Sequence, residues 1–185
     1  MSELNLQRAC EYLTQGKVIA YPTEAVWGLG CDPNNRDAVE RIAQLKNREI
    51  GKGLILVAAN IDQLGTLLDS LSEEQVATLE VSWPGPVTWL IPDPHDIIPI
   101  WIKGNHQSVA IRVSAHPIVQ KLCLEFGSPI VSTSANTGGE QEIRSRLILQ
   151  QQFASSIDYI VSGELGTQSR TSEIRDLVSG KIIRG

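Results

Sequence analysis

The sequence has 185 residues, of which 42% are hydrophobic, 20% charged and 5% aromatic, and its formal net charge at pH 7 is −5. This composition excludes disordered, collagen-like and coiled-coil proteins, and the length predicts a single domain over 1–185 with a sizeable core. The negative charge counts against a protein that binds nucleic acid through an overall positive charge.

In the first half of the chain, helical patterns alternate with β-rich runs. Gly16 ends the first helical pattern, and 54–57 is a continuous apolar run, typical of a strand covered on both faces. In chain order, we expect a helix over about 4–15, a strand over 17–21, a glycine-bearing loop over 27–30, a helix over 36–46, a strand over 54–57, and helices over 60–68 and 72–81.

The second half contains more strands, several of them joined by turns. Because turns rather than helices connect them, we expect an α/β protein with a twisted sheet of mixed parallel and antiparallel strands, flanked by helices. In chain order, the expected elements are strands over 87–91 and 108–113, a helix over 117–126, a strand over 129–132, a small-residue loop over 133–139, a helix near 141–153, and short strands near 157–161, 173–177 and 181–184.

Charges are distributed unevenly along the chain. Residues 53–102 contain no Lys or Arg but seven acids, which leaves 16 basic against 14 acidic residues elsewhere, a net charge of +2. Basic side chains must therefore gather outside this acidic segment.

Neither export nor a membrane is predicted. Cys10, Cys31 and Cys123 are an odd number without a CxxC spacing, which argues against a disulfide framework and a zinc site. A reducing cytoplasm fits best. The N-terminus lacks the pattern of a signal peptide, and no stretch approaches the ~18–20 apolar residues of a membrane span.

Three cations, Lys46, Arg48 and Lys52, lie within seven residues at the predicted end of a helix and in the loop beyond it. A solvated helix cap explains such cations. They also suit an anion pocket, where Arg48 offers a planar fork and the lysines offer compact charges to phosphate oxygens. The residues alone leave both interpretations open.

Polar residues also gather where two strands are predicted to end. Ser132, Thr133, Ser134 and Asn136 follow one strand, and Thr23-Glu24 follows another. Such loops commonly line a site in α/β proteins, although a hydrogen-bonded turn explains each loop equally well. Together with the basic segment they favour a site.

Several familiar motifs are missing. There is no GxxxxGK[ST] loop, so a bound nucleotide would be held by side chains. His95, His106 and His116 show no metal-ligand spacing and are predicted to be surface or structural residues. GxSxG is absent, and Cys31 and Cys123 lie in apolar company, which gives a nucleophilic hydrolase little support. The four tryptophans are predicted core residues.

Five ordered segments resemble the YrdC/Sua5 family, and the resemblance is closest to its short bacterial members. They are KVIAYPTEAVWGLGCDP, KNR…GKGLIL, SWPGPVTW, SVAIRVSAHP and VSTSAN, and the resemblance as a whole covers about 18–184. The KxR…SxN signature of the family falls on Lys46, Arg48, Ser134 and Asn136. The resemblance implies a YrdC-like sheet and a positively charged cavity.

The resemblance also implies an activity, that of a nucleotidyltransferase making L-threonylcarbamoyladenylate. Such an enzyme joins L-threonine, bicarbonate or CO2 and ATP, with Mg²⁺, and releases pyrophosphate. Partner proteins then transfer the threonylcarbamoyl group to the adenosine beside the anticodon of tRNAs that read codons beginning with A. A weak direct contact with tRNA is left open.

Site residues follow from the positions of the family's motifs. Catalytic roles are implied for Lys46, Arg48, Ser134 and Asn136, and threonine binding is implied for Thr23, Arg112 and Ser172. No metal ligand of the protein is implied, since Mg²⁺ would arrive on the ATP phosphates. The late motif, STIVD in many relatives, differs here at Glu173 and Arg175. ATP contacts are implied for Lys46, Arg48, Lys52, Ser132, Ser134 and Asn136.

Two other functional classes remain open, an RNA-binding module and a nucleotide-binding protein without turnover. The net charge of −5 counts against the first, because phosphate-dominated binding needs many cations on one face. Glu24 is a candidate for proton transfer during carbamate formation, but a turn or cap carboxylate explains it equally well.

Overall fold

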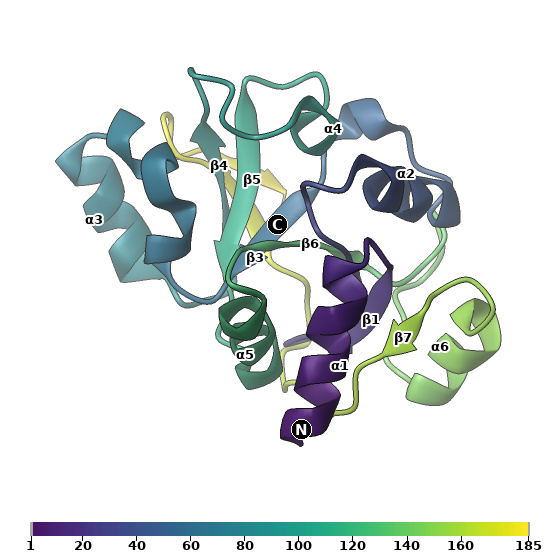
Figure 1. Cartoon of the computed structure of the whole chain (residues 1–185). Helices are drawn as coiled ribbons and strands as arrows, with labels where there is room; N and C mark the ends of the chain where they lie inside the picture. The colour runs from purple at the N-terminus through teal and green to yellow at the C-terminus, as the bar shows by residue number, and fades with distance from the viewer. Residues whose placement is uncertain (1, 185) are drawn as a thin grey trace.

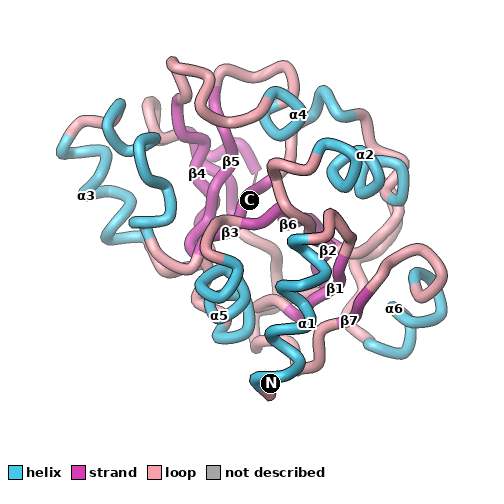
Figure 2. The backbone as a smooth tube through the Cα atoms, in the orientation of Figure 1, coloured by secondary structure: helices cyan, strands magenta, loops and turns pink. Residues whose placement is uncertain are grey.

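A computed structural model describes residues 2–184, in which a mixed β-sheet carries helices on both faces (Figures 1 and 2). Its strands are β1 (Ile19–Pro22), β2 (Trp27–Gly30), β3 (Ile55–Ala58), β4 (Val87–Pro92), β5 (Ser108–Val113), β6 (Ile130–Ser134), β7 (Tyr159–Ile160), β8 (Glu173–Asp176) and β9 (Ile182–Arg184). The strand order is β7-β1-β2-β6-β3-β5-β4-β8-β9. Pairs β1–β7, β3–β5 and β4–β8 are parallel and the others antiparallel, which confirms the predicted mixed α/β sheet.

Local sequence signals define several helix ends. The Asn35 side chain accepts a hydrogen bond from a backbone N–H in the first turn of α2, and Ser72 with Gln75 forms a capping box on α3. Gly127, with φ of 85°, ends α5. Within residues 2–184, no helix is both long and apolar enough to cross a membrane. The helices are α1 (Glu3–Thr14), α2 (Arg36–Leu45), α3 (Glu73–Ser82), α4 (Ile100–Lys103), α5 (Pro117–Phe126) and α6 (Arg146–Phe153), with 3₁₀ turns η1 (Ile50–Lys52) and η2 (Ile61–Ser70).

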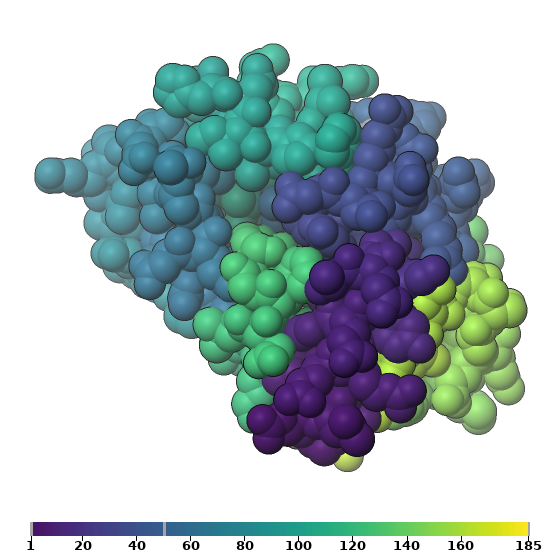
Figure 3. Space-filling model, in the orientation of Figure 1, coloured from purple at the N-terminus to yellow at the C-terminus, as the bar shows by residue number. Residues whose placement is uncertain are grey.

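The two faces of the sheet have separate apolar cores. Successive strand residues point to opposite faces, so Leu56 packs with Ile42 of α2 in one core. Its neighbour Val57 packs with Leu13 of α1 and Leu122 of α5 in the other. Helices α1 and α5 lie side by side on this second face (Figures 1 and 3). The prediction that the 54–57 run is covered on both faces is confirmed for Leu56 and Val57, whereas Ile55 is only half-buried and lines a pocket.

Beyond α1 and α5, the second face stays open. Ile55 is in register with Ser132 on one side and with Ala110 on the other, so all three share the face of Val57. Arg112 is in register with Val57 and lies on the same face. These residues line a pocket, and the uncovered part of the sheet is its floor.

Some predicted elements were wrong. Residues 27–30, predicted as a loop, form β2, because Gly30 lets neighbouring backbones approach: a Cβ there would lie 2.6 Å from the carbonyl oxygen of Val131. The helical pattern over 60–68 is a 3₁₀ segment kinked at Gly65, and the helix predicted from 141 begins at Arg146. The short helix α4 was not predicted.

Candidate active site

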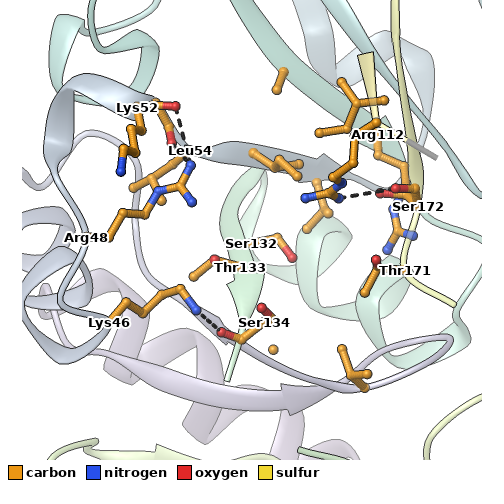
Figure 4. A pocket seen from close by; sticks show the side chains of 18 of the residues that line it. Lys46, Arg48, Lys52, Leu54, Arg112, Ser132, Thr133, Ser134, Thr171 and Ser172 are labelled. Carbon is orange, nitrogen blue, oxygen red and sulfur yellow. Dashed lines mark hydrogen bonds between the residues drawn. The ribbon is translucent and has the colours of Figure 1, made fainter. Parts of the chain in front are cut away.

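A cavity of about 660 Å³ opens over the uncovered part of the sheet, within the usual size range of small-molecule sites. Figure 4 shows Lys46, Arg48 and Lys52 on one side, Arg112 and Ser172 on the other, and serine and threonine hydroxyls between them. The fold thus brings together segments that are more than 100 residues apart. All of the predicted site residues line the cavity: Thr23, Lys46, Arg48, Lys52, Arg112, Ser132, Ser134, Asn136 and Ser172.

The loop after α2 forms a basic wall. Nη2 of Arg48 donates hydrogen bonds to the carbonyl oxygens of Gly53 (2.9 Å) and Lys52 (3.3 Å), which holds the guanidinium across its own loop. Burial and the nearby charge of Arg184 lower the pKa of Arg48. Within residues 2–184, no carboxylate lies within 4 Å of the guanidinium of Arg48 or that of Arg184. Two cations without a counter-ion favour an anionic ligand.

Lys46 connects the basic wall to the loop after β6. Its ammonium group donates to the carbonyl oxygens of Ser134 (2.5 Å) and Asn136 (2.9 Å) and to Oδ1 of Asn136 (3.0 Å). All three N–H donors are therefore used, and the residue is only 4% exposed. Burial, followed by repulsion from Arg48, lowers the pKa of Lys46 to about 8.

The amide of Asn136 is held in one orientation. Its Oδ1 accepts a hydrogen bond from the Ser134 hydroxyl (2.6 Å), and its Nδ2 donates to the carbonyl oxygen of Glu140 (2.7 Å). Together with the contact from Lys46, these bonds fix both polar residues of the SxN motif. The motif is pre-organised by the protein itself.

Arg112 is buried on the opposite side, where its Nη2 donates to Oε2 of Glu24 (2.8 Å). Among the described residues, this is the hydrogen bond that its side chain makes, so most of its five N–H donors remain for a ligand. Near it, the Thr23 hydroxyl donates to the carbonyl oxygen of Val26 (2.7 Å). The hydroxyl oxygens of Ser172 and Thr88 lie 2.7 Å apart.

Sequence reasoning missed Lys103, a buried residue of the pocket wall. Its Nζ lies 2.9 Å from Asp93, which is fully buried, and 2.5 Å from Asp96. Burial lowers the pKa of Lys103, but hydrogen bonds to both carboxylates outweigh it and raise the pKa above its usual value. Asp93 and Asp96, two acids of the segment 53–102 that contains no Lys or Arg, thus form ion pairs with Lys103, the residue that follows this segment. Nothing in the local sequence pattern marks such a pair.

The remaining titratable residues divide between structure and pocket. His116, predicted as surface or structural, caps α5 by accepting a hydrogen bond from the N–H of Ile118 (3.3 Å). His106 is exposed but lines the pocket, which its sequence context did not indicate. Cys31 and Cys123 are free, buried thiols whose pKa values burial raises. Within residues 2–184, no three His, Cys, Asp or Glu side chains gather to hold a metal ion.

Curated relatives match the chain over its full length. A protein of Pseudomonas aeruginosa named threonylcarbamoyl-AMP synthase is 50% identical over 184 residues, covering 100% of this chain and 98% of its own. A protein of the same name from Hahella chejuensis is 48% identical, and the match covers 100% of both chains. These relatives are nucleotidyltransferases, which confirms the prediction of an enzyme of this type.

Solved structures share the fold. P. abyssi Sua5 in complex with L-threonine is 31% identical with a TM-score of 0.89, covering 98% of this chain and 53% of that one. This chain thus spans about half the length of that Sua5 chain. E. coli YciO, 23% identical, has a TM-score of 0.87 over 99% of this chain and 89% of its own, and shows the fold alone. The family model of Sua5/YciO/YrdC, described as "Telomere recombination", matches residues 11–185, and the chain therefore belongs to the Sua5/YciO/YrdC family.

Proposed function

We propose that the chain is a threonylcarbamoyl-AMP synthase, which converts L-threonine, bicarbonate or CO2 and ATP into L-threonylcarbamoyladenylate and pyrophosphate. The observation that carries this proposal is the two-sided pocket, with Lys46, Arg48 and Lys52 on one wall and Arg112 on the other. Full-length relatives of that name and the threonine complex of P. abyssi Sua5 support it.

The reaction has two bond-forming steps. The threonine amine attacks the carbon of CO2, an N–C bond forms as the electron pair of one C=O π bond moves to oxygen, and the nitrogen loses a proton to water to give a carbamate. A carbamate oxygen then attacks the α-phosphorus of ATP, the bond from that phosphorus to the bridging oxygen of the β-phosphate breaks, and pyrophosphate leaves with the electron pair. Because an anion attacks an anion, the main requirements are charge neutralisation and alignment.

The basic wall answers the first requirement. Arg48 is held by its own loop and has no carboxylate partner among the described residues, so its charge is available to the phosphates. Lys52, which is exposed and whose Nζ lies 4.0 Å from Glu49, adds a second charge at the same wall. Lys46 has used its N–H donors on the protein, so it contributes positive charge and fixes the SxN motif. We assign Lys46, Arg48 and Lys52 to ATP.

The polar residues on the floor of the pocket meet the second requirement, the alignment of the substrates. Ser132, Ser134 and Asn136 lie between the two walls and orient the junction of the amino acid and the nucleotide. On the far wall, the free N–H groups of Arg112 suit the threonine carboxylate, with Thr23 and Ser172 beside it. The reaction then needs no covalent nucleophile from the protein.

Mg²⁺ is proposed to enter the site on the phosphates of ATP. Phosphate oxygens are ligands that Mg²⁺ prefers, and the pocket wall adds Glu142 as a further oxygen donor. When bound, the ion would neutralise charge on the phosphates that Arg48 and Lys52 also contact.

The product is a reactive mixed anhydride, which suits transfer to a second protein. We propose that it is passed to the proteins that make threonylcarbamoyladenosine beside the anticodon in tRNAs that read codons beginning with A. A cytoplasmic location is part of this proposal, supported by three free thiols at Cys10, Cys31 and Cys123.

An assay of pyrophosphate release tests the proposal. The protein is incubated with ATP, bicarbonate and Mg²⁺, with and without L-threonine, and the adenylate is identified by mass spectrometry. Release that depends on threonine is expected. Nucleotide binding without such release would instead indicate a binding protein, and salt-sensitive RNA binding without it would indicate an RNA module.

Substitutions in the basic wall test the residue assignments. Arg48→Ala should reduce pyrophosphate release by about a hundredfold or more, by analogy with the loss of one electrostatic stabiliser in other active sites. Lys121→Ala, which removes an exposed cation of α5 outside the pocket, is the matched control and should leave turnover unchanged. Circular dichroism should be used to check that both variants fold. Unchanged turnover in Arg48→Ala would refute the role of Arg48 in binding the phosphates.

A further inference from the structure

Glu24 is a buried residue of the far wall of the pocket and contacts several structural elements. Its Oε2 accepts a hydrogen bond from Arg112 (2.8 Å). Its Oε1 accepts three more, from the Ser114 hydroxyl (2.7 Å) and from the backbone N–H groups of Ala115 (3.1 Å) and His116 (3.2 Å). One carboxylate thus joins the turn after β1, the end of β5 and the start of α5.

These contacts leave Glu24 little capacity as a base. Its Oε1 accepts three hydrogen bonds from the protein, and its Oε2, which keeps a second lone pair, is held against the guanidinium of Arg112, whose charge disfavours protonation of the carboxylate. Burial raises its pKa, but the charge of Arg112 and the hydrogen bond from Ser114 outweigh burial and leave the pKa below its usual value. The other titratable groups around it are His116 and Tyr21.

The backbone around Glu24 ties further pocket segments to it. The N–H of Gly166 donates to the carbonyl oxygen of Thr23 (2.9 Å), and the N–H of Gln168 donates to that of Glu24 (3.0 Å). A Cβ on Gly166 would lie 2.8 Å from the Cα of Glu24, so only glycine permits this approach. Moving Glu24 would therefore displace Thr23 as well as Arg112.

From this geometry we propose that Glu24 is a positioning residue, which fixes Arg112 as the receptor for the carboxylate of the amino-acid substrate and takes no proton itself. This inference rests on the proposed function. It assigns Glu24 an action through Arg112, so the affinity for threonine should depend on Glu24 while the chemistry at phosphorus should not.

Glu24→Gln tests the proposal because glutamine has a single acceptor oxygen. If that oxygen keeps the three donors of the β5–α5 corner, the amide NH₂ faces the guanidinium of Arg112, and donor meets donor. We expect the KM for threonine to rise about tenfold to a hundredfold, the loss of one charged hydrogen bond. The kcat and the KM for ATP should change by less than about twofold, and the pH profile should keep its shape. The reason is that the lost interaction binds threonine equally in the ground state and in the transition state.

A matched control is Asp158→Asn. Asp158 also pairs with an arginine, Arg41 (2.5 Å), and accepts from the N–H of Val18 (2.9 Å), but it does not line the pocket. A merely structural role for Glu24 would give both variants the same signature, lower thermal stability with unchanged KM values. Ser114→Ala, which keeps both charges, is the reserve variant if Glu24→Gln does not fold, and should raise the KM for threonine about threefold.

A double-mutant cycle isolates the action through Arg112. Glu24→Gln should add almost nothing to the effect of Arg112→Gln on threonine affinity if the two residues act together. An unchanged KM for threonine, additive effects in the cycle, or loss of the acidic limb of the pH profile would each overturn the proposal. Calorimetric titration with threonine provides the same comparison without turnover, so a wild-type protein that binds threonine but releases no pyrophosphate would contradict the proposed reaction and leave this inference testable.

Discussion

Nucleotide binding should weaken as Lys46 loses its proton. Lys46 is buried where the basic wall meets the SxN motif, and its pKa is lowered to about 8 by burial and by Arg48. At pH 7 about nine tenths of the molecules carry a charged Lys46, and at pH 9 only about one tenth do. If the charged form alone binds ATP, the apparent Kd rises about tenfold between these pH values.

The assay is calorimetric titration with a non-hydrolysable ATP analogue and Mg²⁺ at pH 7, 8 and 9. Binding is preferred to turnover because the protonation of threonine and the balance of CO2 and bicarbonate also change in this range. Lys46→Met, of similar length but without charge, is the control: it should bind weakly and show little dependence on pH. An equal pH dependence in wild type and Lys46→Met would refute the reasoning.

The stability of the fold should respond in the opposite direction. The folded-state pKa of Lys46, about 8, lies below its usual value of 10.5, so between these pH values the unfolded chain binds more protons. The contribution of this residue to stability therefore rises with pH across that window, and its penalty is complete below about pH 8. The difference in melting temperature between wild type and Lys46→Met should thus change in favour of wild type as the pH rises.

Two pairs of substitutions test the packing around the pocket. Asp93→Asn breaks the buried pair with Lys103 and should cost about 3–5 kcal/mol in urea unfolding, whereas Glu40→Gln, in a solvent-exposed i,i+4 pair, should cost less than about 0.5 kcal/mol; equal costs would contradict this account. Gly28 lines the pocket, and Gly28→Ala places a Cβ 3.2 Å from the methyl group of the Thr23 side chain. The fold should tolerate this substitution, while the KM for the substrate threonine should rise because pocket space is lost. Gly30→Ala places a Cβ 2.6 Å from a backbone carbonyl and should strongly lower the melting temperature; a reversed order would show that the glycines serve another purpose.

Local sequence was sufficient for most of the fold. Helical and strand periodicities each repeat within a few residues, so they can be recognised in a short stretch of sequence without knowledge of its neighbours in space. This was the case for the helices predicted over 36–46 and 117–126 and for the strand predicted over 108–113. Residues 27–30 could not be recognised in this way, because a glycine-rich strand has few side chains to reveal its periodicity. Its pairing with β6 depends on backbone approach, which only the assembled sheet creates.

The same division applies to the site. The sequence by itself indicated many of the side chains that line the pocket, since Lys46, Arg48 and Lys52 are neighbours along the chain and the family motifs mark Ser134 and Asn136, but it did not indicate Lys103 or His106. It could not determine what those side chains do in the pocket.

Tertiary structure decided the partners and the charge states. It placed the ammonium of Lys46 on the loop after β6, gave Arg112 a counter-ion in Glu24, 88 residues away, and set the buried Lys103 against Asp93. Burial and charge–charge contact govern these properties, and both depend on residues that are brought together only by folding.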